Sequence, residues 1–336
     1  MKSAKPLIAI TMGDPAGIGP EIVMRTAADP GISALGSIAV YGDKRILSQT
    51  KAMLGLEVRL RRVAKPTRDP RYGKIVQVVE SHGDVDLSTV KPGHTNAKCG
   101  KASVRFLEAA TREALAARID ALVTAPVCKT ALWEAGTRVE GQTQFLSTLC
   151  NVKKIGMVLI REPLRVMLLT RHMPLKTALN RVTKRRILEK IRLAHREFEK
   201  IGIPTPRIAV AGLNPHAGEA GLFGREEIRE IAPAIAVARK EGIAVSGPAP
   251  ADTVFQQGLA GQIDLVLALY HDQGMIPVKT LGFGNLVVWI AGLPIIRTSV
   301  GHGTAFNIAG QGVADHASLV AAFKMAVKMA KTCPWS

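Results

Sequence analysis

The chain alternates short apolar runs with longer amphipathic segments. The first apolar runs are Leu7–Met12, Ile38–Tyr41, Ile75–Val79 and Ala121–Val123. They show almost no polar alternation, which is typical of strands that helices cover on both faces. Helical periodicity is clearest at Lys101–Ala117, Thr183–Ile201, Glu226–Glu241 and Leu319–Lys331. This alternation predicts an α/β fold with a largely parallel sheet.

Three further apolar runs each lead into a histidine. Leu164–Thr170 is followed by His172, Arg207–Leu213 by His216, and the run after Asp264 by His271. Ligands of open α/β sheets gather at the carboxyl ends of the strands. The three histidines therefore either form a common site or each hydrogen-bond a turn. The other five histidines do not follow this pattern: His82, His94, His195, His302 and His316.

Composition points to an ordinary soluble α/β enzyme. The 336 residues are 47% hydrophobic and include 31 glycines, which leaves room for two domains. The four cysteines, Cys99, Cys128, Cys150 and Cys333, form no C-x-x-C pair, so we expect a reducing cytoplasm. The N-terminal apolar run stops at Gly13-Asp-Pro and reads as a strand rather than a signal peptide. Leu286–Ile296 is too short to span a bilayer.

The formal charge of +18 is the strongest outlier in the composition. A basic face is one requirement for nucleic-acid binding. Against that function, only 4% of residues are aromatic, and no recognition motif or basic tail is present. The cluster Lys184-Arg-Arg186 opens a predicted helix whose apolar face includes Ile187 and Ile191, so its charges are expected to face solvent. We interpret the charge mainly as a solvated surface that attracts anions.

A glycine-rich turn follows the first strand at Gly13-Asp-Pro-Ala-Gly-Ile-Gly-Pro-Glu-Ile22. Asp43 closes the next strand about where a Rossmann fold places its ribose-binding acid, but Ile22 occupies the position of the third glycine. The pattern leaves three interpretations open: a simple Rossmann loop, a plain tight turn, or a different nucleotide-binding fold.

Two segments from opposite ends of the chain resemble the β-decarboxylating dehydrogenases of isopropylmalate and isocitrate. Residues 13–21 are similar to their Gly-Asp-Gly-Ile-Gly-Pro-Glu loop, and residues 299–315 are similar to their adenosine-binding loop. The resemblance implies NAD as cofactor. It assigns cofactor binding to Gly301, His302, Gly303, Thr304, Asn307 and Gly310.

Motifs along the whole chain resemble the 4-hydroxythreonine-4-phosphate dehydrogenase (PdxA) family. They include Thr124-Ala-Pro-Val-Cys-Lys129, Leu213-Asn-Pro-His-Ala-Gly-Glu219, His271-Asp-Gln-Gly274 and Leu293-Pro-Ile-Ile-Arg-Thr-Ser-Val300. The resemblance implies a two-domain α/β/α homodimer, similar to isopropylmalate dehydrogenase, with the active site in the cleft between the domains and completed across the dimer. We expect one domain at residues 1–130 and 300–336, and a second at 131–299 that carries the metal ligands and the dimer interface.

The same resemblance implies a divalent metal held by His172, His216 and His271. Three neutral imidazoles suit Zn²⁺, with Mg²⁺, Mn²⁺ or Co²⁺ as alternatives, and leave positions open for a substrate. Asp252 and Asp272 are the nearby acids, and either could orient a ligand histidine. The expected catalytic residues are Asp252, Asp272 and Lys279. The expected substrate-binding residues are Gln142, Thr143, Lys279 and Arg297, with Lys129 as a further positive charge.

Three departures from the family pattern affect substrate recognition. Gln142 and Gln144 stand in a Gly-Gln-Thr-Gln segment where the family commonly has Gly-His-Thr-Glu, and the family's substrate-binding asparagine falls on Val288. Gly301 replaces an aspartate in a variant associated with dehydrogenases of the terephthalate cis-dihydrodiol. The sequence thus predicts an NAD- and metal-dependent dehydrogenase that oxidises and decarboxylates an anionic hydroxy acid. A three-histidine metal hydrolase or lyase, or a basic nucleic-acid-binding protein, are the alternatives.

Overall fold

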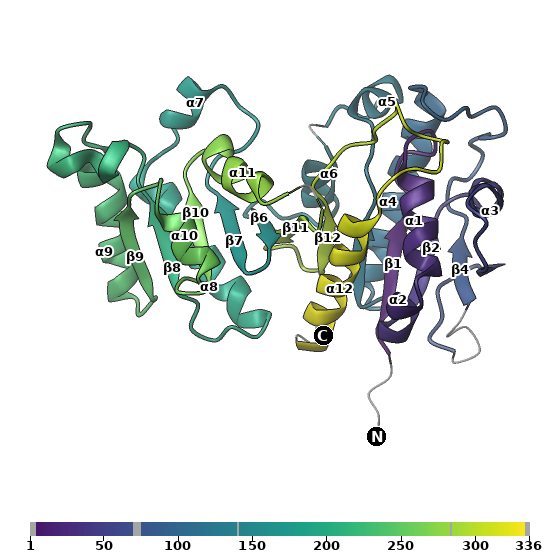
Figure 1. Ribbon diagram of the computed structural model, residues 1–336, viewed down its shortest axis with the longest axis horizontal. Coiled ribbons are helices and arrows are strands. Elements are labelled where there is room, and N and C mark those ends of the chain that lie inside the picture. Colours follow the sequence, from purple (N-terminus) through teal and green to yellow (C-terminus); the bar gives the residue numbers. More distant parts are fainter. Residues whose placement is uncertain (1–4, 70–74, 140, 283, 333–336) are drawn as a thin grey trace. The chain divides into compact units, whose positions relative to one another are not determined.

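The computed structural model describes residues 5–69, 75–139, 141–282 and 284–332. Cys333 and part of the stretch Arg62–Gly73, which its two prolines predict to be an irregular connector, lie outside the described residues. The chain forms two compact units. Unit 1 comprises Met1–Lys153 and Leu293–Ser336, and unit 2 comprises Lys154–Gly292. Both units combine helices with strands, so the predicted α/β class is confirmed (Figure 1).

Unit 1 contains a parallel sheet in the strand order β3-β4-β2-β1-β5-β12. Its strands are β1 (Leu7–Thr11), β2 (Ser37–Tyr41), β3 (Arg59–Arg62), β4 (Ile75–Val79), β5 (Ala121–Thr124) and β12 (Arg297–Val300). After β1 the chain builds to one side through β2 and later returns to the other side at β5. The carboxyl ends of β1 and β5 therefore form a topological switch point, where sheets of this kind bind ligands.

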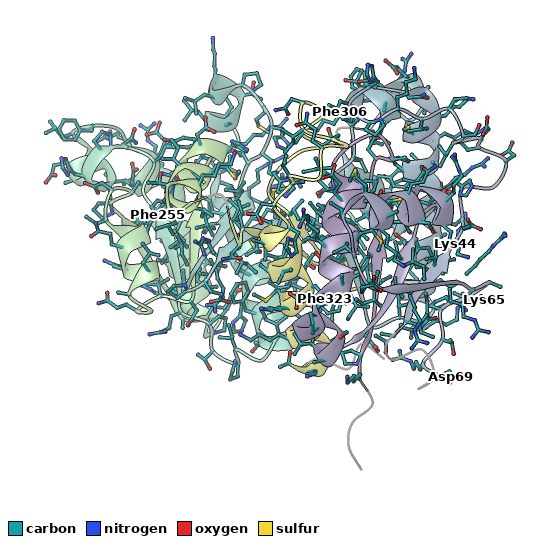
Figure 2. All side chains as sticks on the ribbon, turned by 45° about the vertical axis from the view of Figure 1, so that its right-hand side comes forward. Lys44, Lys65, Asp69, Phe255, Phe306 and Phe323 are labelled. Carbon is teal, nitrogen blue, oxygen red and sulfur yellow. The ribbon has the colours of Figure 1, made fainter. Side chains whose placement is uncertain are left out.

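The helices of unit 1 lie between these strands and at the end of the chain. They are α1 (Gly19–Ala28), α2 (Pro30–Leu35), α3 (Lys44–Met53), α4 (Ala97–Leu115), α5 (Lys129–Glu134), α6 (Gln142–Leu149) and α12 (Ala317–Thr332). The C-terminal helix α12 packs against α1, α2 and β12. Figure 2 labels its buried Phe323 beside these first helices, whereas Lys44 and Lys65 extend away from the ribbon, as expected for a solvated basic surface.

Unit 2 has strands in the order β11-β6-β7-β10-β8-β9. They are β6 (Gly156–Arg161), β7 (Leu164–Leu168), β8 (Ile208–Ala211), β9 (Val245–Ala249), β10 (Leu265–Ala268) and β11 (Val287–Ala291). From β7 to β9 the strands are parallel, whereas β6 pairs antiparallel with both β7 and β11. Every residue of β8 and β10 is buried, so both faces of the sheet are covered at these strands.

The helices of unit 2 follow its parallel strands. They are α7 (Leu175–Leu179), α8 (Lys184–Lys200), a π-helical turn (Glu227–Ile231) continued by α9 (Ala232–Lys240), α10 (Val254–Leu259) and α11 (His271–Thr280). Phe198 of α8 packs on Trp289 of β11 with ring centroids 5.6 Å apart, and both side chains are buried. Within the described ranges, no helix is both long enough and apolar enough to cross a membrane.

The boundaries of the compact units differ from those of the expected domains. The domain boundaries were predicted at residues 130 and 300, whereas the compact units divide at Lys153 and Leu293. The reason is packing, because α5 and α6 lie against α4 and β12 pairs with β5.

A cluster of basic residues, Arg59–Arg62, forms the edge strand β3, which pairs with β4. Exposed arginines on such an edge discourage pairing with another chain.

Candidate active site

Three neighbouring parallel strands of unit 2 deliver the three histidines. The middle strand, β10, pairs with β7 on one side and with β8 on the other. His172 follows β7, His216 follows β8, and His271 is the first residue of α11, the helix that follows β10. Since parallel strands end at the same edge of a sheet, all three histidine-bearing segments begin at the carboxyl edge of unit 2.

Buried side chains tie these three strand ends together. Thr170 Oγ1 donates to the carbonyl of Leu269 at 2.9 Å and so links the ends of β7 and β10. Gln273 Oε1 accepts from Leu269 N at 2.6 Å, while its Nε2 donates to the carbonyl of Gly212, beyond β8, at 2.7 Å. Both side chains are buried, so they satisfy backbone groups that water does not reach. Gln273 was missed as a site residue, although it directly follows the His271-Asp272 pair.

His172 and His271 lie side by side, with ring centroids 5.3 Å apart. Asp272 Oδ1 lies 2.6 Å from His271 Nδ1. A carboxylate in this position holds the proton on Nδ1 and leaves Nε2 as the basic nitrogen, the arrangement common for histidines that bind metals. With its proton on Nδ1, His271 has the lone pair on Nε2 that can bind a divalent metal.

His216 occupies an unusual backbone conformation. Five successive residues, from His216 to Ala220, have φ between +42° and +84°, and four of them are not glycine. Left-handed backbone costs about 1–2 kcal/mol for each such residue and is concentrated at functional sites. The His216 ring lies 6.4 Å, between centroids, from that of Phe223. Across the described residues, no three His, Cys, Asp or Glu side chains are grouped closely enough to hold a metal. The structure therefore brings the predicted ligands His172 and His271 together, but not all three predicted ligands.

Glu227 anchors the segment before His216. Its Oε1 accepts from Leu213 N at 2.7 Å and from Asn214 N at 2.8 Å, and its Oε2 accepts from Asn214 Nδ2 at 2.8 Å. The side chain is buried, with 3% of its surface exposed. Glu227 was also missed by sequence reasoning, because it lies in a predicted amphipathic helix with nothing to mark it as a buried anchor.

The other two predicted catalytic residues of unit 2 are less constrained. Lys279 lies in the last turn of α11, the helix that His271 begins, and is partly exposed. Asp252 is exposed in the turn before α10. Neither side chain makes a hydrogen bond or an ion pair with the described residues, so both remain predictions.

Arg297 of β12 is a buried cation in unit 1, with 3% of its surface exposed. Its Nη2 donates to Thr124 Oγ1 at 2.6 Å and to Gln142 Oε1 at 3.2 Å, whereas its buried Nε has no hydrogen-bond partner. In the part of the chain that the structure describes, no acidic side chain forms an ion pair with it. Burial lowers the pKa of the guanidinium, and a buried charge without a counter-ion is costly. These properties fit a binding site for an anion.

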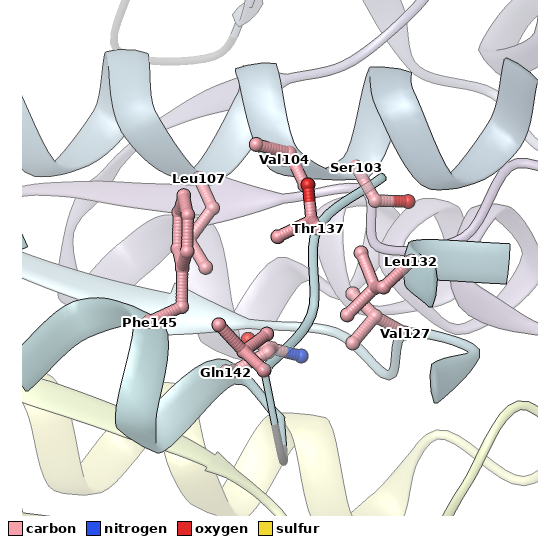
Figure 3. Close-up of a pocket in the computed structure, with 9 residues that line it drawn as sticks. Ser103, Val104, Leu107, Val127, Leu132, Thr137, Gln142 and Phe145 are labelled. Carbon is pink, nitrogen blue, oxygen red and sulfur yellow. The ribbon is translucent and has the colours of Figure 1, made fainter. Parts of the chain in front are cut away.

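The Gln142 amide has a defined orientation. Its Nε2 donates to the carbonyl of Ala125 at 2.9 Å, which turns Oε1 toward Arg297. Gln142 also lines a small cavity between α4, α5 and α6, where Figure 3 shows it near Phe145 and below Val104 and Leu107. The cavity has a volume of about 10 Å³, room for about one water molecule. It is too small for a substrate. Thr143, the next residue, is partly exposed.

The two loops that resemble nucleotide-binding segments meet within unit 1. Ile18 N donates to the carbonyl of Thr304 at 2.9 Å. A Cβ atom on Gly17 would lie 2.9 Å from Thr304 Cβ, so glycine permits this close approach. The side chain of Asn307 is exposed in the second loop. This contact brings the two ends of the chain together at one loop cluster.

Asp14 is a buried carboxyl at the switch point between β1 and β5. Its Oδ1 accepts from Ala16 N at 2.9 Å, whereas Oδ2 has no partner, and 1% of the residue's surface is exposed. Burial raises its pKa from 3.8 to about 6, against the opposing effect of the Ala16 and Cys128 backbone groups. The folded chain therefore retains a proton between pH 4 and 6 that the unfolded chain releases.

We expect Asp14→Asn to stabilise the protein at pH 8 but not at pH 4. A raised pKa in the folded state means that stability falls as pH rises from about 4 to about 6, since charging Asp14 is disfavoured only when it is buried. Asparagine keeps the acceptor for Ala16 N and removes this cost, on the order of 3 kcal/mol above pH 6. Urea unfolding at both pH values measures the difference. An equal gain at pH 4 and pH 8 would contradict the assignment.

Comparison with known proteins agrees with this architecture. The chain combines two α/β units, with His172 and His271 adjacent in unit 2 and the buried Arg297 guanidinium in unit 1. Residues 34–326 match the model of the pyridoxal phosphate biosynthetic protein PdxA. The chain belongs to the PdxA family, as its motifs predicted.

The relatives are similar over nearly the full chain. D-threonate 4-phosphate dehydrogenase of Pectobacterium atrosepticum is 39% identical, covering 96% of this chain and 99% of the relative. The crystal structure of 4-hydroxythreonine-4-phosphate dehydrogenase from Klebsiella pneumoniae is 41% identical with a TM-score of 0.88, covering 97% and 100%. A terephthalate 1,2-cis-dihydrodiol dehydrogenase from Burkholderia xenovorans LB400 is 31% identical with a TM-score of 0.68, covering 96% and 98%. These names support an oxidoreductase that acts on CH–OH groups.

Proposed function

We propose that the protein is an NAD- and divalent-metal-dependent dehydrogenase that oxidises and decarboxylates an anionic hydroxy acid. The observation that carries the proposal is the His172–His271 pair, with Asp272 held on His271 Nδ1. This arrangement prepares imidazole nitrogens for a metal and has no simple role in stability, because the rings lie at the surface edge of the sheet. The family's dehydrogenase names support the same class of reaction.

Some residues of the chain would bind the metal, the substrate and the cofactor, and others would transfer a proton. His172, His216 and His271 would hold the metal, with Asp272 orienting His271. When bound, the metal would lower the pKa of the substrate hydroxyl and NAD would accept the hydride. Arg297 would bind the anionic end of the substrate, together with Thr143 and Lys279, and Lys279 or Asp252 would transfer the proton. Residues 301–310 would bind the adenosine part of NAD.

We further propose that the protein acts as a homodimer. Several large apolar side chains of unit 2 are strongly exposed on the segments that carry or follow the three histidines. They are Leu175 (57%), Leu222 (75%), Phe223 (49%), Ile228 (50%) and Ile276 (64%). Exposed apolar surface of this kind marks association sites, and a second copy of the chain is the partner we propose for it.

The substrate is proposed to be less polar than 4-phosphohydroxythreonine. Val288 is a buried residue of β11, and its apolar side chain cannot supply the contact that an asparagine side chain makes. Gln142 replaces an imidazole that could carry charge, and its amide is already engaged by Ala125 and Arg297. A site that has lost such polar contacts discriminates against a substrate that needs them. The dihydrodiol dehydrogenase among the similar structures makes cyclic hydroxy acids natural candidates.

A substrate screen tests the proposed function. We expect metal-dependent NADH formation with at least one of 4-phosphohydroxythreonine, D-threonate 4-phosphate and the terephthalate cis-dihydrodiol. The first should have a kcat/KM about tenfold to a hundredfold below the best substrate, since each stranded polar partner costs about 1–3 kcal/mol. Release of CO₂ and preference for NAD over NADP are measured in the same assay. Failure to reduce NAD with any of them would reject the function, whereas 4-phosphohydroxythreonine as the best substrate would reject only the specificity.

A further inference from the structure

Helix α1 holds the second nucleotide-like loop through Glu21, which is buried, and Arg25, which is partly buried. Glu21 Oε1 accepts from Gly310 N at 2.6 Å, and one turn later Arg25 Nη2 donates to the carbonyl of Gly312 at 2.6 Å. Together with the bond from Ile18 N to the carbonyl of Thr304, three hydrogen bonds join α1 and its N-cap residue to residues 304–312. All these groups lie within unit 1.

Stability alone does not account for the placement of Glu21. Only 2% of its surface is exposed, and one carboxylate oxygen, Oε2, is buried without a hydrogen-bond partner. Arg25 Nε is likewise buried without a partner. A buried polar atom that makes no hydrogen bond costs free energy, most of all in a charged group. A leucine at position 21 would avoid that cost and would lose only the bond to Gly310.

The backbone at the other end of these bonds is also specified. Gly310 and Gly312 have φ of +81° and +70°, in the left-handed region that favours glycine. A Cβ atom on Gly310 would lie 2.8 Å from Pro92 Cβ, so a larger residue there would displace the loop. Gly310 and Gly312 therefore define the conformation of the loop beside α1, and Glu21 and Arg25 form hydrogen bonds with these two glycines.

We infer that Glu21 and Arg25 are positioning residues for the dinucleotide. They fix residues 304–312 in the conformation that binds the adenosine part before the cofactor arrives, which lowers the entropy lost on binding. This inference rests on the proposed function, since it takes residues 301–310 as the NAD-binding loop. It adds two residues of α1 that do not need to touch the cofactor themselves.

The test compares Glu21→Leu with Glu21→Gln in the full-length protein. Leucine removes the acceptor for Gly310 N, and we expect the Kd for NAD to rise about tenfold, as for one lost hydrogen bond. The KM for the hydroxy acid at saturating NAD should stay within twofold. Glutamine keeps an acceptor oxygen and should restore the wild-type Kd. Hydrogen exchange of residues 301–313 should be faster in Glu21→Leu only, and Arg25→Met should raise the Kd in the same direction.

Asp120→Asn is the matched control. Asp120 Oδ2 also accepts a backbone N–H, that of Leu7 at 2.6 Å, but at the start of β1, the opposite end of the strand from the loops. Its Kd for NAD should be unchanged. A wild-type Kd and unchanged exchange in Glu21→Leu would overturn the inference, as would equal losses in Glu21→Leu and Glu21→Gln. A wild-type chain that binds no NAD would instead reject the proposed function, and this inference with it.

Discussion

Arg297→Met is expected to lower kcat/KM by a factor of about 10²–10³ without destabilising the fold. Loss of one partner from a buried charge contact costs about 2–5 kcal/mol in binding. The free energy of unfolding should not fall, because the guanidinium is buried without an acidic partner among the described residues and its Nε lacks any hydrogen bond. Methionine fills similar volume and removes that uncompensated charge. Steady-state kinetics and urea unfolding of the same variant measure both effects.

Two further variants sharpen this test. Arg297→Lys keeps the charge but lacks the planar guanidinium, whose Nη2 donates to both Thr124 and Gln142, so we expect only partial recovery of kcat/KM. Arg118→Met is the control, since Arg118 is an exposed arginine of the same unit, paired with Glu113. Its kinetics should equal those of the wild type. If Arg297→Met keeps kcat/KM within threefold, Arg297 does not bind the substrate.

The regular part of this molecule could be predicted from the sequence because burial leaves a direct pattern. Runs such as Val166–Leu169 are apolar throughout because the strands they belong to are covered on both faces. The position of each histidine after such a run follows from the same pattern. The order of the strands in the sheet was not predicted. That β7, β10 and β8 are neighbours follows from long-range pairing, which leaves no local signal.

The supporting polar contacts could not be predicted for a related reason. Gln273 and Glu227 are polar residues in helical segments, where sequence patterns place them on solvated faces. Both are buried because they bond backbone groups beyond the ends of neighbouring strands, such as Gly212 and Leu213. The segment His216–Ala220 could not be anticipated either, since left-handed backbone in non-glycine residues has little sequence signature. Such exceptions to local rules are expected to concentrate at functional sites.

The structure shows where the basic side chains behind the charge of +18 lie. Most basic side chains are exposed or paired with acids at the surface, as Arg192 is with Glu241 and Arg207 with Asp264. Such pairs contribute little to stability. Arg297 differs in being buried and without a described acidic partner. The general surface charge would draw an anionic substrate toward the protein, and Arg297 would bind it at one position.

Removal of the metal ligands should have the largest effect of all. We expect the wild-type protein to bind close to one divalent ion per chain, and His271→Ala to lose both the ion and more than 10³-fold in kcat. A bound metal contributes several kcal/mol of transition-state stabilisation, which corresponds to at least this factor. His172→Ala should behave in the same way because the two rings lie together. Elemental analysis and chelator competition measure the metal independently of activity.

Asp272→Asn and His216→Ala separate the roles within the site. Asparagine at 272 cannot hold the proton on His271 Nδ1 as a carboxylate does, so metal affinity should fall about tenfold to a hundredfold. His216→Ala should also remove most of the metal if His216 completes the triad on binding. Retention of the metal in that variant alone would instead define a site built on His172 and His271. His195→Ala, on α8 of the same unit and paired with Glu199, is the control and should keep a full complement of metal. Full metal content in His271→Ala and His172→Ala would exclude these histidines as metal ligands. The proposed metal-dependent chemistry, which depends on this pair, would then be rejected as well.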